Sequence, residues 1–189
     1  MSQHSTLYPA IKECADAVAA MAAGIGTEQL GDPTPCEKFT VAELLDHLGG
    51  TLMSSARAAR KEPLVPDEDV STAMPALVAE SAVLAAAAWA DPAAYEGVCE
   101  FGPGEMPAGF AAAITLQELA LHGWDLARAT GRPFTLGEDT ARVTLGVVEQ
   151  IAEQARSTGG YAPPVPESAG ARAFQRALAA SGRNPEWHN

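Results

Sequence analysis

The chain has 189 residues, of which 47% are hydrophobic and only 6% aromatic, which is typical of a helical domain with an alanine- and leucine-filled core. Its 24 acidic and 12 basic residues give a net charge of −12, and no basic cluster could neutralise a run of phosphates, so nucleic acid and anionic membrane surfaces are not expected as partners. No signal-peptide pattern begins the chain, no stretch approaches the roughly 18 apolar residues of a membrane span, and the three cysteines form no CxxC pair. These features predict a cytoplasmic protein.

The first half of the chain contains two predicted helices. Apolar residues at helical spacing predict the first over residues 7–25. After a proline-rich loop at residues 32–36, Thr40 and Glu43 have the spacing of a capping box, which predicts that the second helix starts at Thr40. His47 lies at the flank of its apolar face, which consists of Val41, Leu44, Leu45, Leu48 and Leu52.

A connection is predicted over residues 61–70, followed by an alanine-rich helix over residues 75–90 and a short extended piece or hairpin over residues 95–101. The longest helix is predicted over residues 107–130, a further helix over residues 138–156 and a short final helix over residues 171–181. Trp89 is expected to pack in the core. No repeat or second boundary appears, so residues 1–189 are expected to form one domain. Helices joined by such loops predict an all-α antiparallel bundle, in which polar sites are built from facing helices.

The most informative motif is Glu118-Leu-Ala-Leu-His122, which continues to Asp125. At about 100° per residue, these three ionisable side chains fall within roughly 60° on one line of a largely apolar helix. An unpaired buried carboxylate is costly, and the usual remedies are a cation, a hydrogen-bonded pair or protonation. A divalent metal bound by Glu118 and His122 would satisfy both groups, although from spacing alone an ordinary ion pair or surface pair is more common.

His47 is the other histidine expected within a helix, because His4 and His188 lie in segments expected to fray. In a bundle, His47 could meet Glu118 and His122, and two histidines with one glutamate are an established ligand set for catalytic zinc. Such sites also accept nickel, iron or manganese. Taken alone, His47 is more commonly a satisfied or half-exposed histidine.

Two carboxylates, Asp125 and Glu43, are candidates to orient a ligand imidazole. Asp125 could equally pair with Arg128, three residues further on. Cys36 is a single cysteine in a proline-rich loop, and the usual state of such a thiol is packed and inert.

Three segments carry a resemblance to a known family: residues 32–36 (DPTPC), 39–50 (FTVAELLDHLGG) and 121–131 (LHGWDLARATG). They resemble the metal-binding family related to the N-terminal domain of mycothiol-dependent maleylpyruvate isomerase, within the DinB-like superfamily. Residues 161–166 (YAPPVP) and 182–187 (GRNPEW) are similar to that family's tail, so the resemblance extends over nearly the whole chain. The expected fold is therefore all-α, a DinB-like four-helix bundle with additional short C-terminal helices and room for a small β-hairpin.

The resemblance implies that His47, Glu118 and His122 hold a divalent metal, with zinc expected first. It also implies a metal-dependent thiol S-transferase or isomerase-like enzyme that uses mycothiol as cosubstrate on a small electrophile. Maleylpyruvate itself is not expected as the substrate, because the isomerase has an additional C-terminal domain that is not recognised here. The alternative is a non-catalytic metal-binding or regulatory module, and the sequence leaves open whether two copies form a homodimer.

Overall fold

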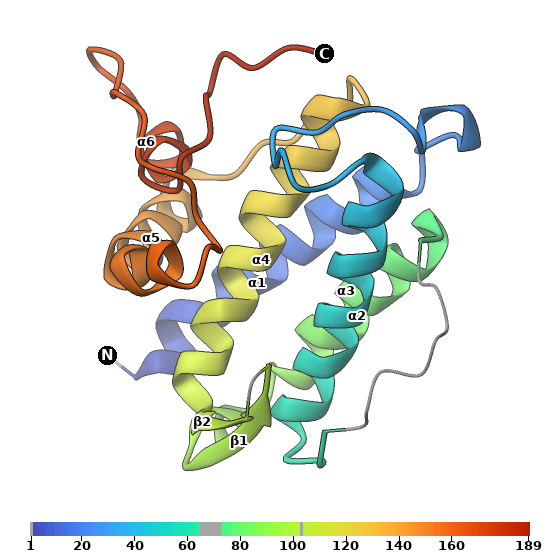
Figure 1. Cartoon of the computed structure of the whole chain (residues 1–189). Helices are drawn as coiled ribbons and strands as arrows, with labels where there is room; N and C mark the ends of the chain where they lie inside the picture. The colour runs from blue at the N-terminus through green and yellow to red at the C-terminus, as the bar shows by residue number, and fades with distance from the viewer. Residues whose placement is uncertain (1, 65–72, 103) are drawn as a thin grey trace.

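The computed structural model describes residues 2–64, 73–102 and 104–189 and is mainly helical. The four bundle helices are α1 (Gln3–Ala22), α2 (Val41–Ala59), α3 (Pro75–Ala88) and α4 (Ala108–Ala129), followed by α5 (Glu138–Ser157) and α6 (Ala173–Ala180) (Figure 1). The smaller elements are the single-turn helices η1 (Thr27–Gln29) and η2 (Pro92–Tyr95) and the strands β1 (Val98–Phe101) and β2 (Gly104–Pro107). None of the described helices combines the length and apolar character needed to cross a membrane.

The bundle pairs α1 with α3 and α4, and α2 with the same two helices. Trp89, just beyond α3, donates its indole N–H to Ser55 near the end of α2, so these two helices run in the same direction. His4, at the start of α1, donates to the carbonyl oxygen of Ala90 beyond α3, so α1 and α3 are antiparallel. Figure 1 shows the same direction for α1 and α4.

The predicted antiparallel bundle is therefore correct for the pairs α1–α3 and α2–α4 and wrong for α2–α3 and α1–α4. The reason is the length of the connection from residue 60 to residue 74. A 19-residue helix such as α2 is about 28 Å long, and a chain of that connection's length can return over the whole distance. His4 also corrects a prediction, because it lies in α1, stacked on Tyr8, rather than in a frayed end.

The start of α2 is the capping box that the sequence predicts. The Thr40 hydroxyl accepts from the backbone N–H of Glu43, and the Glu43 carboxylate accepts from the backbone N–H of Thr40. The apolar face of the helix is buried as expected, including Leu44, Leu48 and Leu52. This cap fixes where α2 begins, and so fixes the position of His47 about two turns later.

The later elements follow the sequence closely. Trp89 is fully buried, and β1 pairs with β2 as a hairpin in which Cys99 lies opposite Met106. With 22 residues, α4 is the longest helix among the described residues, and it ends at Ala129, with Thr130 as its cap before Gly131, which has a φ of 67°. Most of the predicted connection over residues 61–70 lies outside the described residues.

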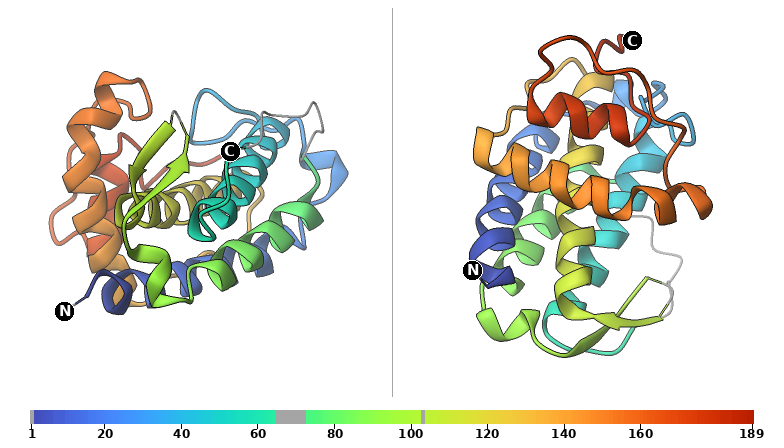
Figure 2. Two further views of the ribbon diagram at one scale, coloured as in Figure 1. Left: turned by 90° about the horizontal axis from the view of Figure 1, so that it is seen from below. Right: turned by 90° about the vertical axis from the view of Figure 1, so that its left-hand side faces the viewer.

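The last two helices form a layer on one side of the bundle. Figure 2 shows α5 and α6 running across the direction of the bundle helices, with α5 packed on α1 and α4. Of the two, α6 is short, as expected, with 8 residues, whereas α5 has 20. The chain after α6 returns over α4, where Arg128 donates to the carbonyl oxygen of Trp187. The C-terminal segment is thereby brought to the face of α4 that carries the polar residues.

Loss of the capping box tests its role in fixing α2. Thr40→Ala removes the acceptor for the Glu43 backbone N–H, and we expect the free energy of unfolding to fall by about 1 kcal/mol in urea titrations. Thr27→Ala, at an exposed position in η1, is the matched control and should change it by less than about 0.5 kcal/mol. Equal effects of the two substitutions would contradict the capping role.

Candidate metal centre

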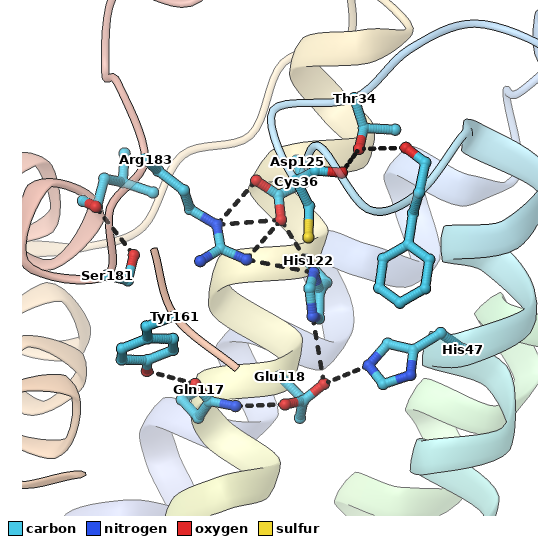
Figure 3. A network of polar contacts seen from close by, with 12 residues as sticks. Thr34, Cys36, His47, Gln117, Glu118, His122, Asp125, Tyr161, Ser181 and Arg183 are labelled. Atoms are coloured by element: carbon cyan, nitrogen blue, oxygen red, sulfur yellow. Dashed lines mark hydrogen bonds and ion pairs between the residues drawn. The ribbon is translucent and has the colours of Figure 1, made fainter. Parts of the chain in front are cut away.

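The centre of the site is one oxygen of the Glu118 carboxylate. Its Oε2 lies 3.2 Å from Nε2 of His47 and 3.5 Å from Nε2 of His122 (Figure 3). The two imidazole rings are nearly perpendicular, with centroids 5.1 Å apart. The side chains are 37% exposed for His47, 13% for Glu118 and 10% for His122, so the cluster is enclosed on the α4 side and reached by solvent on the α2 side.

The Glu118 side chain is mostly buried, at 13% exposed, and yet the pKa of its carboxyl is lowered. Burial disfavours the charged form, but the nearby His122 and the hydrogen bond from His47 outweigh it and hold the pKa of Glu118 below its usual value. The same hydrogen bond raises the pKa of His47. The other carboxylate oxygen, Oε1, accepts a hydrogen bond from the side-chain amide of Gln117. The oxygen that faces the two imidazoles is therefore the one without an amide donor.

His47 is held from the other side by Phe39, the residue just before the cap of α2. The two rings are stacked, with centroids 5.1 Å apart and planes inclined by 17°. Phe39 also makes an edge contact with His122 at a centroid distance of 6.3 Å. The aromatic ring thus limits the rotamers open to His47 and keeps its Nε2 directed at Glu118.

His122 is oriented by Asp125, one turn further along α4. Its Nδ1–H donates to Oδ2 of Asp125 at 2.9 Å, and Asp125 is fully buried. Because Nδ1 carries a proton toward Asp125, Nε2 is the ring nitrogen that faces Glu118 and is placed to bind a metal. A carboxylate that fixes the tautomer of a histidine in this way is a common partner of metal-binding histidines.

Asp125 is in turn paired with Arg183, from the segment after α6. The guanidinium donates from Nε to Oδ1 at 2.9 Å and from Nη2 to Oδ2 at 2.8 Å. Burial opposes ionisation of Asp125, but Arg183 outweighs it and lowers the pKa of the carboxyl below its usual value. Both groups are buried, so the pair is charged in a medium where an unpaired charge is costly.

The three facing atoms fit a single divalent cation. Two ligands of a tetrahedral zinc ion with bonds of about 2.0–2.1 Å are about 3.3 Å apart, close to the distances of 3.2 and 3.5 Å around Oε2 of Glu118. Nε2 of His122 and a carboxylate oxygen lie 3.5 Å apart, and a cation or a proton between the two atoms makes this contact favourable. The donor set is a carboxylate and two imidazoles.

A second cluster shares His122 and has a different character. Cys36 lies with His122 and Asp125 so that one potential ligand atom of each falls within 4.8 Å of the others. Both oxygens of Asp125 already accept from Arg183, and burial raises the pKa of the Cys36 thiol. A protonated thiol beside a saturated carboxylate is a packed group, in agreement with the inert state expected for Cys36.

The structure brings together the three side chains predicted as ligands: His47, Glu118 and His122. Asp125 contacts His122 as anticipated, but its charged partner is Arg183 and not Arg128, which lies 5.7 Å from the ring centroid of Trp124. The prediction that Glu43 could orient an imidazole is wrong, because its carboxylate closes the capping box.

Three residues of the site were missed in the sequence: Gln117, Tyr161 and Arg183. Tyr161 and Arg183 stand in the two tail segments that carry the resemblance, but nothing in those segments indicates what they contact. Gln117 was visible only as a polar residue next to Glu118 in an apolar helix.

The pairing of Asp125 with Arg183 is open to a direct test. Arg183→Met leaves the buried carboxylate without its cation, and we expect the free energy of unfolding to fall by about 3–5 kcal/mol. Arg176→Met is the matched control on α6, because the Arg176 side chain is 41% exposed in its pairs with Glu149 and Glu167, and its loss should cost less than about 1 kcal/mol. Chemical denaturation measures both, and a loss in Arg183→Met no larger than the control would contradict the assigned pair.

Fold and side chains together define a class: a bundle of four helices in which α2 and α4 present two histidines and a glutamate to one another. The family model described as "Mycothiol maleylpyruvate isomerase N-terminal domain" matches residues 11–127. The chain belongs to this family, and the matched residues include His47, Glu118 and His122.

The similar proteins agree with this membership. Two uncharacterized proteins of Mycobacterium tuberculosis, from strains CDC 1551 / Oshkosh and H37Rv, are each 31% identical over 129 residues, which is 67% of this chain and 68% of theirs. A crystal structure of the mycothiol-dependent maleylpyruvate isomerase matches with a TM-score of 0.60 at 13% identity, over 82% of this chain and 75% of that one. A mutant of that isomerase also gives a TM-score of 0.60. The fold is thus the DinB-like bundle that the sequence predicts.

Proposed function

We propose that this protein binds one divalent metal ion through His47, Glu118 and His122. The observation that carries the proposal is the position of Glu118 Oε2 between two imidazole nitrogens at 3.2 and 3.5 Å. Zinc suits this donor set best, while nickel, iron and manganese bind the same combination of ligands. His122 is prepared as a ligand because Asp125 holds its proton on Nδ1.

We further propose that the protein is a metal-dependent thiol S-transferase or isomerase-like enzyme acting on a small electrophile. Membership of a family named for mycothiol supports mycothiol as the thiol. A metal with an open coordination position would lower the pKa of a thiol bound there, so that the thiol is present as a thiolate at neutral pH. In the transfer a sulfur–carbon bond forms, the thiol proton passes to solvent, and the electron pair displaced at the carbon goes to the leaving group or to the conjugated system of the electrophile, which takes up a proton from solvent where it needs one.

The approach of these small molecules is proposed from the α2 side, where His47 is the most exposed of the three ligands. A surface hollow of about 490 Å³ lies on this side, lined among others by Lys38, Phe39, Trp187 and His188. Phe39 connects the two, because it lines the hollow and stacks on His47. The three ligands do not themselves line the hollow, and its link to them is Phe39, so the entry proposed for a thiol and an electrophile is past this ring.

We also propose that residues 1–189 act as one domain. The family match ends at residue 127, but α5 packs on α1 and α4, and Arg183 pairs with Asp125 of α4. These contacts tie the last third of the chain to the bundle that carries the ligands.

Metal content tests the site. For protein purified without an affinity tag, we expect mass spectrometry to find about one ion per chain, lost in His47→Ala, Glu118→Ala and His122→Ala. His188→Ala, which removes an exposed histidine, should keep the ion. A chelator should lower the melting temperature of the wild type, since the ion binds only the folded state. Absence of metal even after reconstitution would rule out the proposed centre in favour of a buried pair.

Thiol consumption tests the activity. With mycothiol and a panel of small electrophiles, we expect turnover by the metal-loaded wild type and a loss of at least about 100-fold in His122→Ala. Arg176→Met, at an exposed position of α6, should retain the wild-type rate. A metal-loaded protein that consumes no thiol with any electrophile would instead indicate the non-catalytic binding module.

A further inference from the structure

A chain of two hydrogen bonds reaches Glu118 from the segment that follows α5. The Tyr161 hydroxyl donates to the side-chain oxygen of Gln117, and the side-chain amide N–H of Gln117 donates to Oε1 of Glu118 (Figure 3). Tyr161 is 8% exposed and Gln117 is 7% exposed, so water competes little for either bond. The proposed binding of metal and thiol gives neither residue a direct role.

The direction of these bonds is set by Glu118, whose carboxylate oxygen accepts from the amide N–H of Gln117 and leaves the amide oxygen to accept from Tyr161. Burial raises the pKa of the Tyr161 phenol, so the hydroxyl keeps its proton and is available as a donor. A phenol that donates to an amide requires the amide oxygen on its own side, which turns the amide N–H groups of Gln117 toward Glu118. With the amide reversed, its oxygen would face the carboxylate of Glu118. Tyr161 holds the amide oxygen of Gln117 in place, and thereby holds the orientation in which Gln117 occupies Oε1 and leaves Oε2 to the histidines.

Local structure explains how Tyr161 reaches α4. Helix α5 ends at Ser157, and the chain then turns at Gly159, where a φ of 75° favours glycine. The backbone N–H groups of Gly160 and Tyr161 both donate to the carbonyl oxygen of Ala155, at 2.7 and 3.2 Å. This turn closes the end of α5 and directs the Tyr161 side chain onto Gln117.

We propose that Tyr161 is a positioning residue of the metal centre, which acts through Gln117 to keep Oε2 of Glu118 as the ligand atom. The inference rests on the proposed metal binding and deepens it. Tyr161 lies outside the family match of residues 11–127, and the inference gives it a part in determining how tightly the ion is bound. Two hydrogen bonds separate Tyr161 from Glu118, so Tyr161 touches neither the metal nor the substrate.

The test compares two tyrosines. Tyr161→Phe removes the hydroxyl and keeps the ring, and we expect the dissociation constant for zinc, measured by competition with a chromophoric chelator, to rise about tenfold. Tyr95→Phe is the matched control, because Tyr95 is equally buried at 8% and the described residues give its hydroxyl no hydrogen-bond partner. This control should leave the dissociation constant unchanged.

Two further measurements separate positioning from general support of the fold. Gln117→Leu should raise the dissociation constant by about 10- to 100-fold, and adding Tyr161→Phe to it should have no further effect, because the contact through which Tyr161 acts is already lost. The visible absorption of the cobalt-substituted protein should change in Tyr161→Phe and not in Tyr95→Phe, since it reports the arrangement of the ligands. Circular dichroism checks that each variant is folded.

The outcomes distinguish this inference from the function on which it rests. If the wild type binds no zinc, the proposed function fails, and this inference fails with it. If the wild type binds zinc and Tyr161→Phe matches Tyr95→Phe in affinity and cobalt spectrum, the metal centre stands and the role of Tyr161 is refuted. Additive effects of the Tyr161 and Gln117 substitutions would also refute it, because they would show that Tyr161 does not act through Gln117.

Discussion

The structure depends on the compensation of one buried negative charge, that of Glu118. A carboxylate in a helical core is tolerated only where each oxygen has a hydrogen-bond partner, and the two oxygens of Glu118 have different kinds of partner. The amide of Gln117 donates to Oε1, while Oε2 faces two imidazoles, one from α2 and one from α4. The antiparallel contact of α2 and α4 meets this need, because it carries His47 to Glu118.

Around this centre, polar groups are arranged in order of their distance from Oε2 of Glu118. The histidines come first, then Gln117 and Asp125, and then Tyr161 and Arg183 from the C-terminal part of the chain. Each outer group satisfies the hydrogen-bonding capacity of the one inside it, so the buried polar atoms of the site support one another. The apolar residues of the bundle determine where the helices lie, and these polar chains determine which way the side chains point.

The parts of the fold that could be predicted from the sequence are those encoded over a few residues. Thr40 and Glu43 mark the start of α2 because a capping box needs only a spacing of three, and Glu118 and His122 share a helix line because of a spacing of four. The relative direction of α2 and α3 could not be predicted from the sequence, because a long connection permits both the parallel and the antiparallel arrangement.

The partners of the site were harder to foresee for the same reason. Arg183 lies 58 residues beyond Asp125, and Tyr161 lies 44 residues beyond Gln117, so no periodic pattern joins them. Arg128 was the obvious local candidate for Asp125, but its guanidinium binds the backbone of Trp187 instead. Asp125 pairs with the distant Arg183 because the segment after α6 passes over this buried carboxylate.

The distance between the inner and outer residues along the chain has a consequence for synthesis in the cell. When α4 has emerged from the ribosome, the nascent chain already holds all three proposed ligands, but Tyr161 and Arg183 have not yet emerged. At about 5–20 residues per second, several seconds pass before Arg183 follows. During that interval Gln117 and Asp125 lack the partners that orient them, so the C-terminal segment closes over ligands that have already emerged.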